Sequence, residues 1–164
     1  MNAPKKLALT LSALVIALPQ AGSARPAALS RSWAGTWQLN TDKSKFSSAE
    51  FARKSDTRIY TVAGNRLTMQ STMITAAGAT IKWSYSAKTD GKWYPTSGNP
   101  NMDQIALTFV SPRALKWTSR LKGKPSVRST ATVSADGKEL TIGRSMLTAK
   151  GGPTNDILVF DRAK

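Results

Sequence analysis

Apolar and polar residues alternate in segment after segment of this chain, and that alternation is the feature that most restricts its fold. The clearest example is residues 81–88, where a single lysine or serine follows each of four apolar residues, namely Ile81, Trp83, Tyr85 and Ala87. A period of two residues is typical of a β-strand with one buried face and one solvated face. No segment carries a long helical period, so parallel strands joined by helices are not expected.

Tight-turn sequences separate these segments at intervals of roughly ten residues, the spacing typical of an all-β barrel or sandwich. The strongest are Asp90-Gly91 and Asp136-Gly137, because glycine accepts the positive φ of a hairpin turn. Consecutive hairpins favour an antiparallel up-and-down β-barrel of about 8–10 strands, with a sandwich as the alternative. At most one short helix is expected, at residues 48–53, with Ser48 as its cap.

The N-terminus has the pattern of a secretory signal peptide. Lys5 and Lys6 precede an apolar run over residues 7–18, and small residues follow up to Ala24. The run is too short to span a membrane, which takes roughly 20 apolar residues. We therefore predict a signal peptide over residues 1–24 and export to the periplasm or the medium. Residues 25–164 then form a single domain that begins with a poorly ordered tail over residues 25–31.

Cysteine and histidine are both absent from the sequence. Without cysteine the exported domain has no disulfide, and cysteine-based redox or metal chemistry is excluded. Without histidine the usual general base and the usual zinc ligand are missing. We therefore predict a protein that is not an enzyme and that uses neither a metal nor a cofactor.

The chain is strongly basic, with 24 Lys and Arg against 9 Asp and Glu and a formal net charge of +15. Such a charge attracts anionic lipid or polyanions. No run of five like charges occurs, which favours a solvated basic surface without a specific nucleic-acid contact. The alternative is a basic wall on the polar strand faces, flanked by Trp93 and Tyr94, that binds a polyanion. Its members would be Lys82, Lys88, Lys116, Arg120 and Arg128.

Two widely separated groups resemble the lipocalins. Gly35-Thr36-Trp37 on the first expected strand is similar to the Gly-x-Trp signature of that family, and Arg162 ends the last expected strand. The chain also resembles a group of uncharacterised exported bacterial proteins with a lipocalin-like barrel, in residues 35–46, 90–100 and 136–141. The resemblance implies a calycin-type barrel closed at one end by Trp37, with Arg162 stacked on its ring. Gly35, Trp37 and Arg162 would then have structural roles.

Several bulky residues share the inward parity of their strands and form the candidate lining of a ligand cavity. They are Met69, Met73, Trp83, Tyr85 and Trp117. Aromatic and methionine side chains make adaptable, mostly apolar pockets, so we predict a small apolar or amphipathic ligand. A completely filled core is the alternative.

Arg144 is the candidate contact for an anionic head group. It shares parity with Leu140, Ile142 and Met146, so a regular strand would point it into the barrel. A guanidinium there offers several donors to a carboxylate or phosphate, but it needs a partner when buried. A bulge at Gly143 would turn Arg144 outward, and we favour that alternative.

Overall fold

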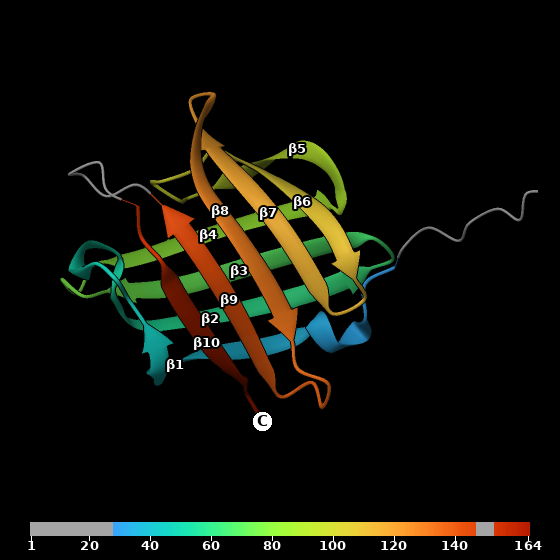
Figure 1. Ribbon diagram of the computed structural model, residues 1–164, viewed down its shortest axis with the longest axis horizontal. Coiled ribbons are helices and arrows are strands. Elements are labelled where there is room, and N and C mark those ends of the chain that lie inside the picture. Colours follow the sequence, from blue (N-terminus) through green and yellow to red (C-terminus); the bar gives the residue numbers. More distant parts are fainter. Residues whose placement is uncertain (1–27, 147–152) are drawn as a thin grey trace, which may run out of the picture.

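The computed structural model describes residues 28–146 and 153–164, which form a closed antiparallel β-barrel (Figure 1). Each strand pairs with its neighbours in sequence, and the first strand closes the barrel by pairing with the last. In Figure 1, strands β6–β10 cross in front of strands β2–β4. The predicted all-β up-and-down barrel is confirmed, whereas the predicted signal peptide lies outside the described residues.

The described residues contain ten strands and two one-turn 3-10 helices, η1 and η2. The strands are β1 (Gly35–Lys45), β2 (Arg53–Ala63), β3 (Arg66–Thr75), β4 (Thr80–Lys88), β5 (Asp90–Ser97), β6 (Gln104–Ser111), β7 (Ala114–Leu121), β8 (Lys124–Val133), β9 (Glu139–Met146) and β10 (Asp156–Arg162). The expected short helix is η2 (Ala49–Phe51), capped by the Ser48 hydroxyl, which accepts from the Glu50 amide at 3.2 Å. The other, η1 (Arg31–Trp33), was not predicted.

Residues 28–31, which precede β1, pack against the barrel, so the prediction of a poorly ordered tail is wrong for these residues. The Leu29 side chain is 6% exposed and belongs to the core. The backbone amide of Ser30 donates to the carbonyl of Pro112 at 2.8 Å. A single leucine among small residues carries no periodic signal, so only the packing of this barrel end reveals its role.

One end of the barrel is closed around Trp37, whose side chain is completely buried. Its indole N–H donates to the Trp33 carbonyl at 3.0 Å, and the Arg162 guanidinium lies 4.3 Å from the centre of a Trp37 ring. Arg162 also donates to the carbonyls of Ala34 at 2.7 Å and Gly137 at 2.6 Å. Charge-assisted bonds and the cation–π contact together join three segments at this end.

Gly35 is required by this arrangement for two reasons. Its φ is +128°, a backbone conformation that residues with a Cβ rarely adopt. A Cβ at this position would also lie 2.5 Å from Nη1 of Arg162. The first residue of the Gly-x-Trp pattern therefore leaves the space in which Arg162 reaches the closed end.

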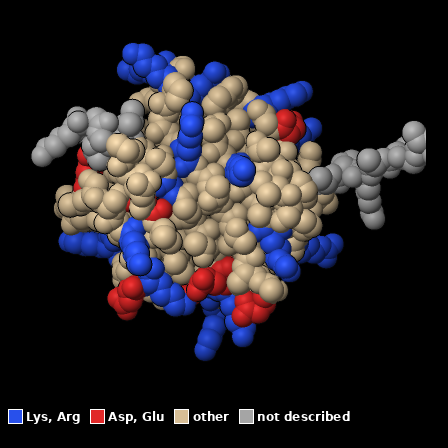
Figure 2. All heavy atoms as spheres, in the orientation of Figure 1, with Lys and Arg blue, Asp and Glu red and all other residues tan. Residues whose placement is uncertain are grey.

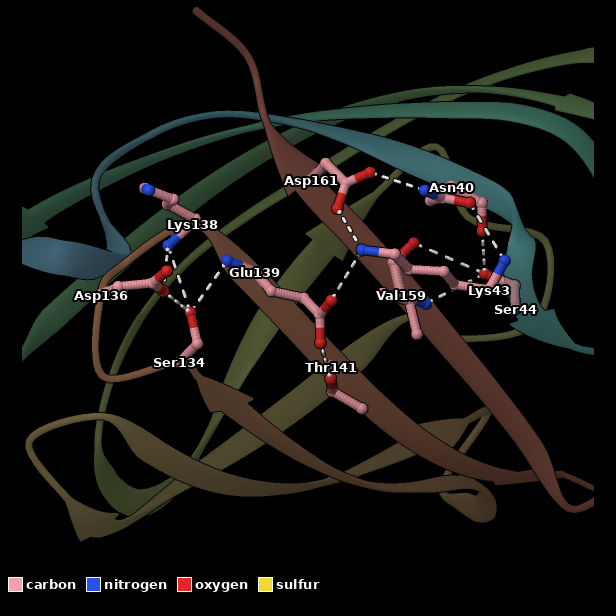
Figure 3. Close-up of polar contacts among 10 residues, drawn as sticks. All are labelled: Asn40, Lys43, Ser44, Ser134, Asp136, Lys138, Glu139, Thr141, Val159 and Asp161. Atoms are coloured by element: carbon pink, nitrogen blue, oxygen red, sulfur yellow. Dashed lines mark hydrogen bonds and ion pairs between the residues drawn. The ribbon is translucent and has the colours of Figure 1, made fainter.

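Polar side chains join β1, β9 and β10 on the outside of the barrel (Figure 3). The β1–β10 register shifts between Asn40 and Lys45, which interrupts the ladder. The Ser44 hydroxyl accepts from the Val159 amide at 3.0 Å and so replaces a missing ladder bond. Lys43 pairs with the carboxylates of Glu139 at 3.0 Å and Asp161 at 3.2 Å. These three charged groups are exposed, so solvent screening weakens their attraction.

The interior is packed unequally along the barrel axis. A large core surrounds Trp33, Trp37 and Phe160 at the closed end. A smaller cluster of Met102, Val127 and Met146 lies toward the opposite end. The candidate site lies in the space between these two clusters.

No helix in the described part of the chain is long and apolar enough to cross a membrane.

Candidate ligand-binding site

A cavity of about 220 Å³ occupies the interior toward the end opposite Trp37. Its walls are largely apolar and include Ile81, Ile142 and Leu158, while Phe51 of η2 and Asn101 of the β5–β6 loop lie at its mouth. Asn101 is exposed, so the cavity reaches the surface. For scale, a cavity of about 150 Å³ holds benzene, and one water in the liquid occupies about 30 Å³. The cavity is therefore large enough for a small organic molecule.

Four of the six residues predicted to line a cavity do line it: Met73, Trp83, Trp117 and Arg144. Met69 and Tyr85 do not, because they face each other across β3 and β4 within the packed core of the closed end. Met69 is completely buried and Tyr85 is 8% exposed. Their inward orientation was predicted, but alternation along a strand does not specify depth along the barrel axis. The prediction that Met69 and Tyr85 lie at the cavity wall is wrong.

Arg144 points into the barrel, and the bulge that we favoured at Gly143 is wrong. Arg144 pairs in regular register with Ser129 on β8 and Asp156 on β10. Its Nη2 donates to Oδ2 of Asp156 at 2.6 Å, which supplies the partner that a buried guanidinium needs. Gly143 instead makes room on the outer face, where a Cβ would lie 3.1 Å from the Thr130 hydroxyl.

A buried charge cluster at the start of β2 was missed by the sequence analysis. Oδ2 of Asp56 accepts from Arg53 Nη1 at 2.5 Å and from Arg58 Nη2 at 2.9 Å. Its Oδ1 accepts from the Ser71 hydroxyl at 2.7 Å. Asp56 and Arg58 share the inward parity of Tyr60, and that shared parity is the signal that was available. A register shift between residues 53 and 55 brings Arg53 to the same face.

Arg58 forms the boundary between the packed core and the cavity. Its guanidinium lies 4.6 Å from the centre of the Phe160 ring and 5.8 Å from that of Trp83. Its Nη1 also donates to the Tyr60 hydroxyl at 3.5 Å. Arg58 contributes to the cavity wall, whereas Phe160 belongs to the core below it. A planar guanidinium suits this position because it stacks on an aromatic face and still pairs at its edge.

Burial and neighbouring charges shift the ionisation of this cluster. Burial opposes the charged form of Asp56, but Arg58 and Arg53 outweigh it and hold the pKa of that carboxyl below its usual range. Burial lowers the pKa of Arg53 to about 10, and repulsion from Arg144 and Arg58 acts in the same direction. Burial also lowers the pKa of Arg144. The arginines remain protonated and Asp56 remains ionised at neutral pH.

The five cations proposed as a basic wall fall into two separate groups. Lys82 and Lys88 lie on β4, whereas the other three lie on β7 and β8, and β5 and β6 separate the groups. Arg120 stacks 4.4 Å from the centre of the Trp93 ring. Lys116 and Arg128 line a hollow on the outer face. Figure 2 shows basic side chains on the middle of this face and acidic ones mostly toward its margins.

Comparisons with known proteins describe the fold. No family model matches the sequence, and no curated protein matches it. Zebrafish ileal bile acid-binding protein in complex with cholic acid superposes with a TM-score of 0.53 and 11% identity, over 80% of this chain and 99% of that chain. Lobster apocrustacyanin A1 matches with a TM-score of 0.39 and 18% identity, over 80% of this chain and 61% of that chain, a likeness too weak to carry an argument. The chain folds as a closed, ten-stranded, lipocalin-like β-barrel.

Proposed function

We propose that this is an exported, non-catalytic, lipocalin-like protein that binds a small amphipathic molecule inside its barrel. The observation that carries the proposal is the cavity of about 220 Å³, which has apolar walls, a few buried polar groups and a mouth at one barrel end. Ligand sites in proteins typically combine a mostly apolar lining with a few convergent polar groups. The same observation argues against a completely filled core.

The cavity volume favours a ligand smaller than a drug-sized molecule, because pockets for such molecules usually hold about 300–1,000 Å³. The zebrafish protein that shares this fold was solved with cholic acid. That complex supports the binding of a small amphipathic molecule by a protein with this kind of fold. For this chain we propose a compact apolar body, such as a short alkyl chain or one aromatic ring, with a polar head.

Features of the sequence support the remaining parts of the proposal. Residues 1–24 have the basic, apolar and small-residue regions of a signal peptide, in keeping with export. The absence of histidine and cysteine argues for binding over catalysis. Asp56 and Asp156 are each held in an ion pair, which leaves these buried carboxylates poorly suited to acid–base work.

The first prediction is that the mature protein binds octanol or octanoate with one-to-one stoichiometry and that Met73→Trp blocks this binding. Met73 lines the cavity, so an indole there fills the space that the ligand needs. Ile74→Trp is the matched control, because the neighbouring side chain is 36% exposed and lies outside the cavity. Isothermal titration calorimetry measures the affinities, and thermal unfolding verifies that both variants are folded.

We expect Met73→Trp to weaken binding at least about tenfold, which corresponds to about 1.4 kcal/mol, and Ile74→Trp to leave it unchanged. Equal affinity in both variants would place the ligand outside the cavity. Native mass spectrometry of protein purified from its own source provides a second test. An added mass that extracts into organic solvent would identify the natural ligand class.

The outer hollow supports a second candidate function, the binding of anionic lipid or polyanions. Lys116 and Arg128 form no ion pair within the described residues. Asp156 also lines the hollow, but its carboxylate is bonded to Arg144 and Ser47. Lys116 and Arg128 therefore have no acidic side chain bonded to them within the described residues and are available to an external anion.

The second prediction is that the protein is retained on heparin and on anionic vesicles at low salt, and that retention falls as salt rises. The double variant Lys116→Gln, Arg128→Gln should elute earlier than the wild type. Lys82→Gln, Lys88→Gln removes the same charge from β4 and serves as the control. If both double variants shift elution equally, only net charge matters and the hollow is not a site.

A further inference from the structure

The charged groups of the barrel interior do not balance. Three guanidiniums line the cavity, those of Arg53, Arg58 and Arg144. Two buried carboxylates, Asp56 and Asp156, lie behind them and do not line it. Glu50 also lines the cavity, but it is exposed at the mouth and lies outside the buried part of the site. The buried part of the site therefore holds one positive charge in excess, and every buried charge that faces the cavity is positive.

The two carboxylates have little remaining capacity to neutralise that excess. Asp56 is shared by Arg53 and Arg58 through one oxygen and accepts from Ser71 with the other. Asp156 accepts from Arg144 with Oδ2 and from the amide and the hydroxyl of Ser47 with Oδ1, both at 2.9 Å. An excess buried cation is costly unless an anion pairs with it.

Unused donors at the cavity wall show where an anion would be held. The Nε atoms of Arg53 and Arg144 are buried and have no hydrogen-bond partner in the described part of the chain, and the same is true of the Ser129 hydroxyl. All three residues line the cavity, and Ser129 and Arg144 are opposed in register on β8 and β9. Arg53 is 8% exposed, and the side chain of Arg144 is 12% exposed. Buried donors in folded proteins nearly always have a partner, so this cluster is unusual.

From this charge count and these donors we propose that the natural ligand is a monoanionic amphiphile with an oxyanion head, such as a carboxylate or a sulfate. The head is held by Arg53 and Arg144 with the Ser129 hydroxyl, and the apolar body lies against Trp83, Trp117 and Ile142. A single negative charge matches the single positive excess. This inference rests on the proposed binding of a ligand in the cavity and adds the chemical class of that ligand.

A series of ligands with one tail tests the proposal on the wild-type protein without any substitution. Titration calorimetry near neutral pH compares octanoate, octyl sulfate, octanol and octylamine. We expect the two monoanions to bind at least about tenfold tighter than octanol, because hydrogen bonds to a charged group are stronger than those to a neutral one. Octylamine, protonated at this pH, should bind most weakly. A further comparison at pH 8 uses octyl phosphate, which is mostly doubly charged at that pH. Octyl phosphate should bind no tighter than octyl sulfate under the same conditions.

Arg53→Gln tests the assignment of the head-group site. The remaining Asp56–Arg58 pair is balanced, so this variant should fold, and the preference for octanoate over octanol should shrink to about threefold or less. Arg113→Gln is the matched control, because Arg113 is exposed in the turn between β6 and β7 and lines neither the cavity nor the outer hollow. It should leave the preference unchanged. Ser129→Ala gives a second test that removes no charge.

The outcomes separate this inference from the proposed function. If octanol and octanoate bind equally and Met73→Trp blocks both, the interior binds ligands but the anion site is wrong. If none of the four main compounds binds, both the proposed function and this inference are overturned. If the anion preference is lost in Arg128→Gln, which changes the outer hollow, and is kept in Arg53→Gln, the anion binds at the outer surface and this inference is overturned. Tightest binding of octylamine or of octyl phosphate would overturn the monoanion assignment.

Discussion

Replacing Asp56 by asparagine is expected to lower the free energy of unfolding by about 3–5 kcal/mol, because it leaves buried guanidiniums without their counter-ion. The carboxylate is completely buried and forms ion pairs with both Arg53 and Arg58. Asparagine keeps the shape of the side chain and removes its charge. The substitution therefore leaves the packing nearly unchanged, and the loss of stability reports the electrostatic contribution of the carboxylate.

Urea unfolding followed by circular dichroism measures this change, since the midpoint multiplied by the slope gives the free energy of unfolding. Asp161→Asn is the matched control, because Asp161 pairs with Lys43 at 3.2 Å on the exposed seam of the barrel. Its effect should be much smaller. Equal losses in the two variants would contradict a special role for the buried cluster. Adding Arg53→Gln to Asp56→Asn should recover part of the loss, because it removes one uncompensated cation.

The same carboxyl also contributes to the acid limit of stability. The pKa of Asp56 in the folded protein lies below its usual value because Arg58 and Arg53 outweigh the opposing effect of burial. Between the folded pKa and the usual aspartate pKa of about 3.9, the unfolded chain therefore binds more protons than the folded protein does. The stabilisation is complete above that pH and is lost as the pH falls through the folded pKa. The free energy of unfolding should depend less on pH in this range for Asp56→Asn.

Replacing Trp37 by alanine is expected to lower the free energy of unfolding by about 3–5 kcal/mol, the usual cost of removing a large buried aromatic side chain. The indole is completely buried, its N–H donates to the Trp33 carbonyl, and the Arg162 guanidinium lies over its ring. The substitution creates a void and removes the cation–π contact together.

Trp93→Ala is the control for the same change in residue type, since Trp93 is 41% exposed on β5 with Arg120 stacked on its ring. We expect less than half the loss seen for Trp37→Ala. Urea unfolding measures both, and near-ultraviolet circular dichroism reports the order of the remaining aromatic side chains. A Trp37→Ala protein as stable as Trp93→Ala would show that the closed end does not depend on this ring.

Strand alternation predicted the barrel because the period of two is a local property of the backbone. It also predicted that Trp83, Trp117 and Met73 face inward, and all three line the cavity. The same rule failed at Met69 and Tyr85, which face inward at the level of the packed core. Depth along the axis depends on the pairing and tilt of all ten strands, and no single strand carries that information.

The sequence by itself determined the alternating strands, the turns between them and the strong positive charge, because each of these depends on residues that are close together in the chain. Only the tertiary structure decided that Arg144 faces Asp156, that Asp56 joins Arg53 and Arg58, and that three guanidiniums converge on one cavity. Charged residues on a short segment look like a solvated face. Whether they are buried depends on the rest of the barrel closing around them, because burial is set by partners that are distant in sequence.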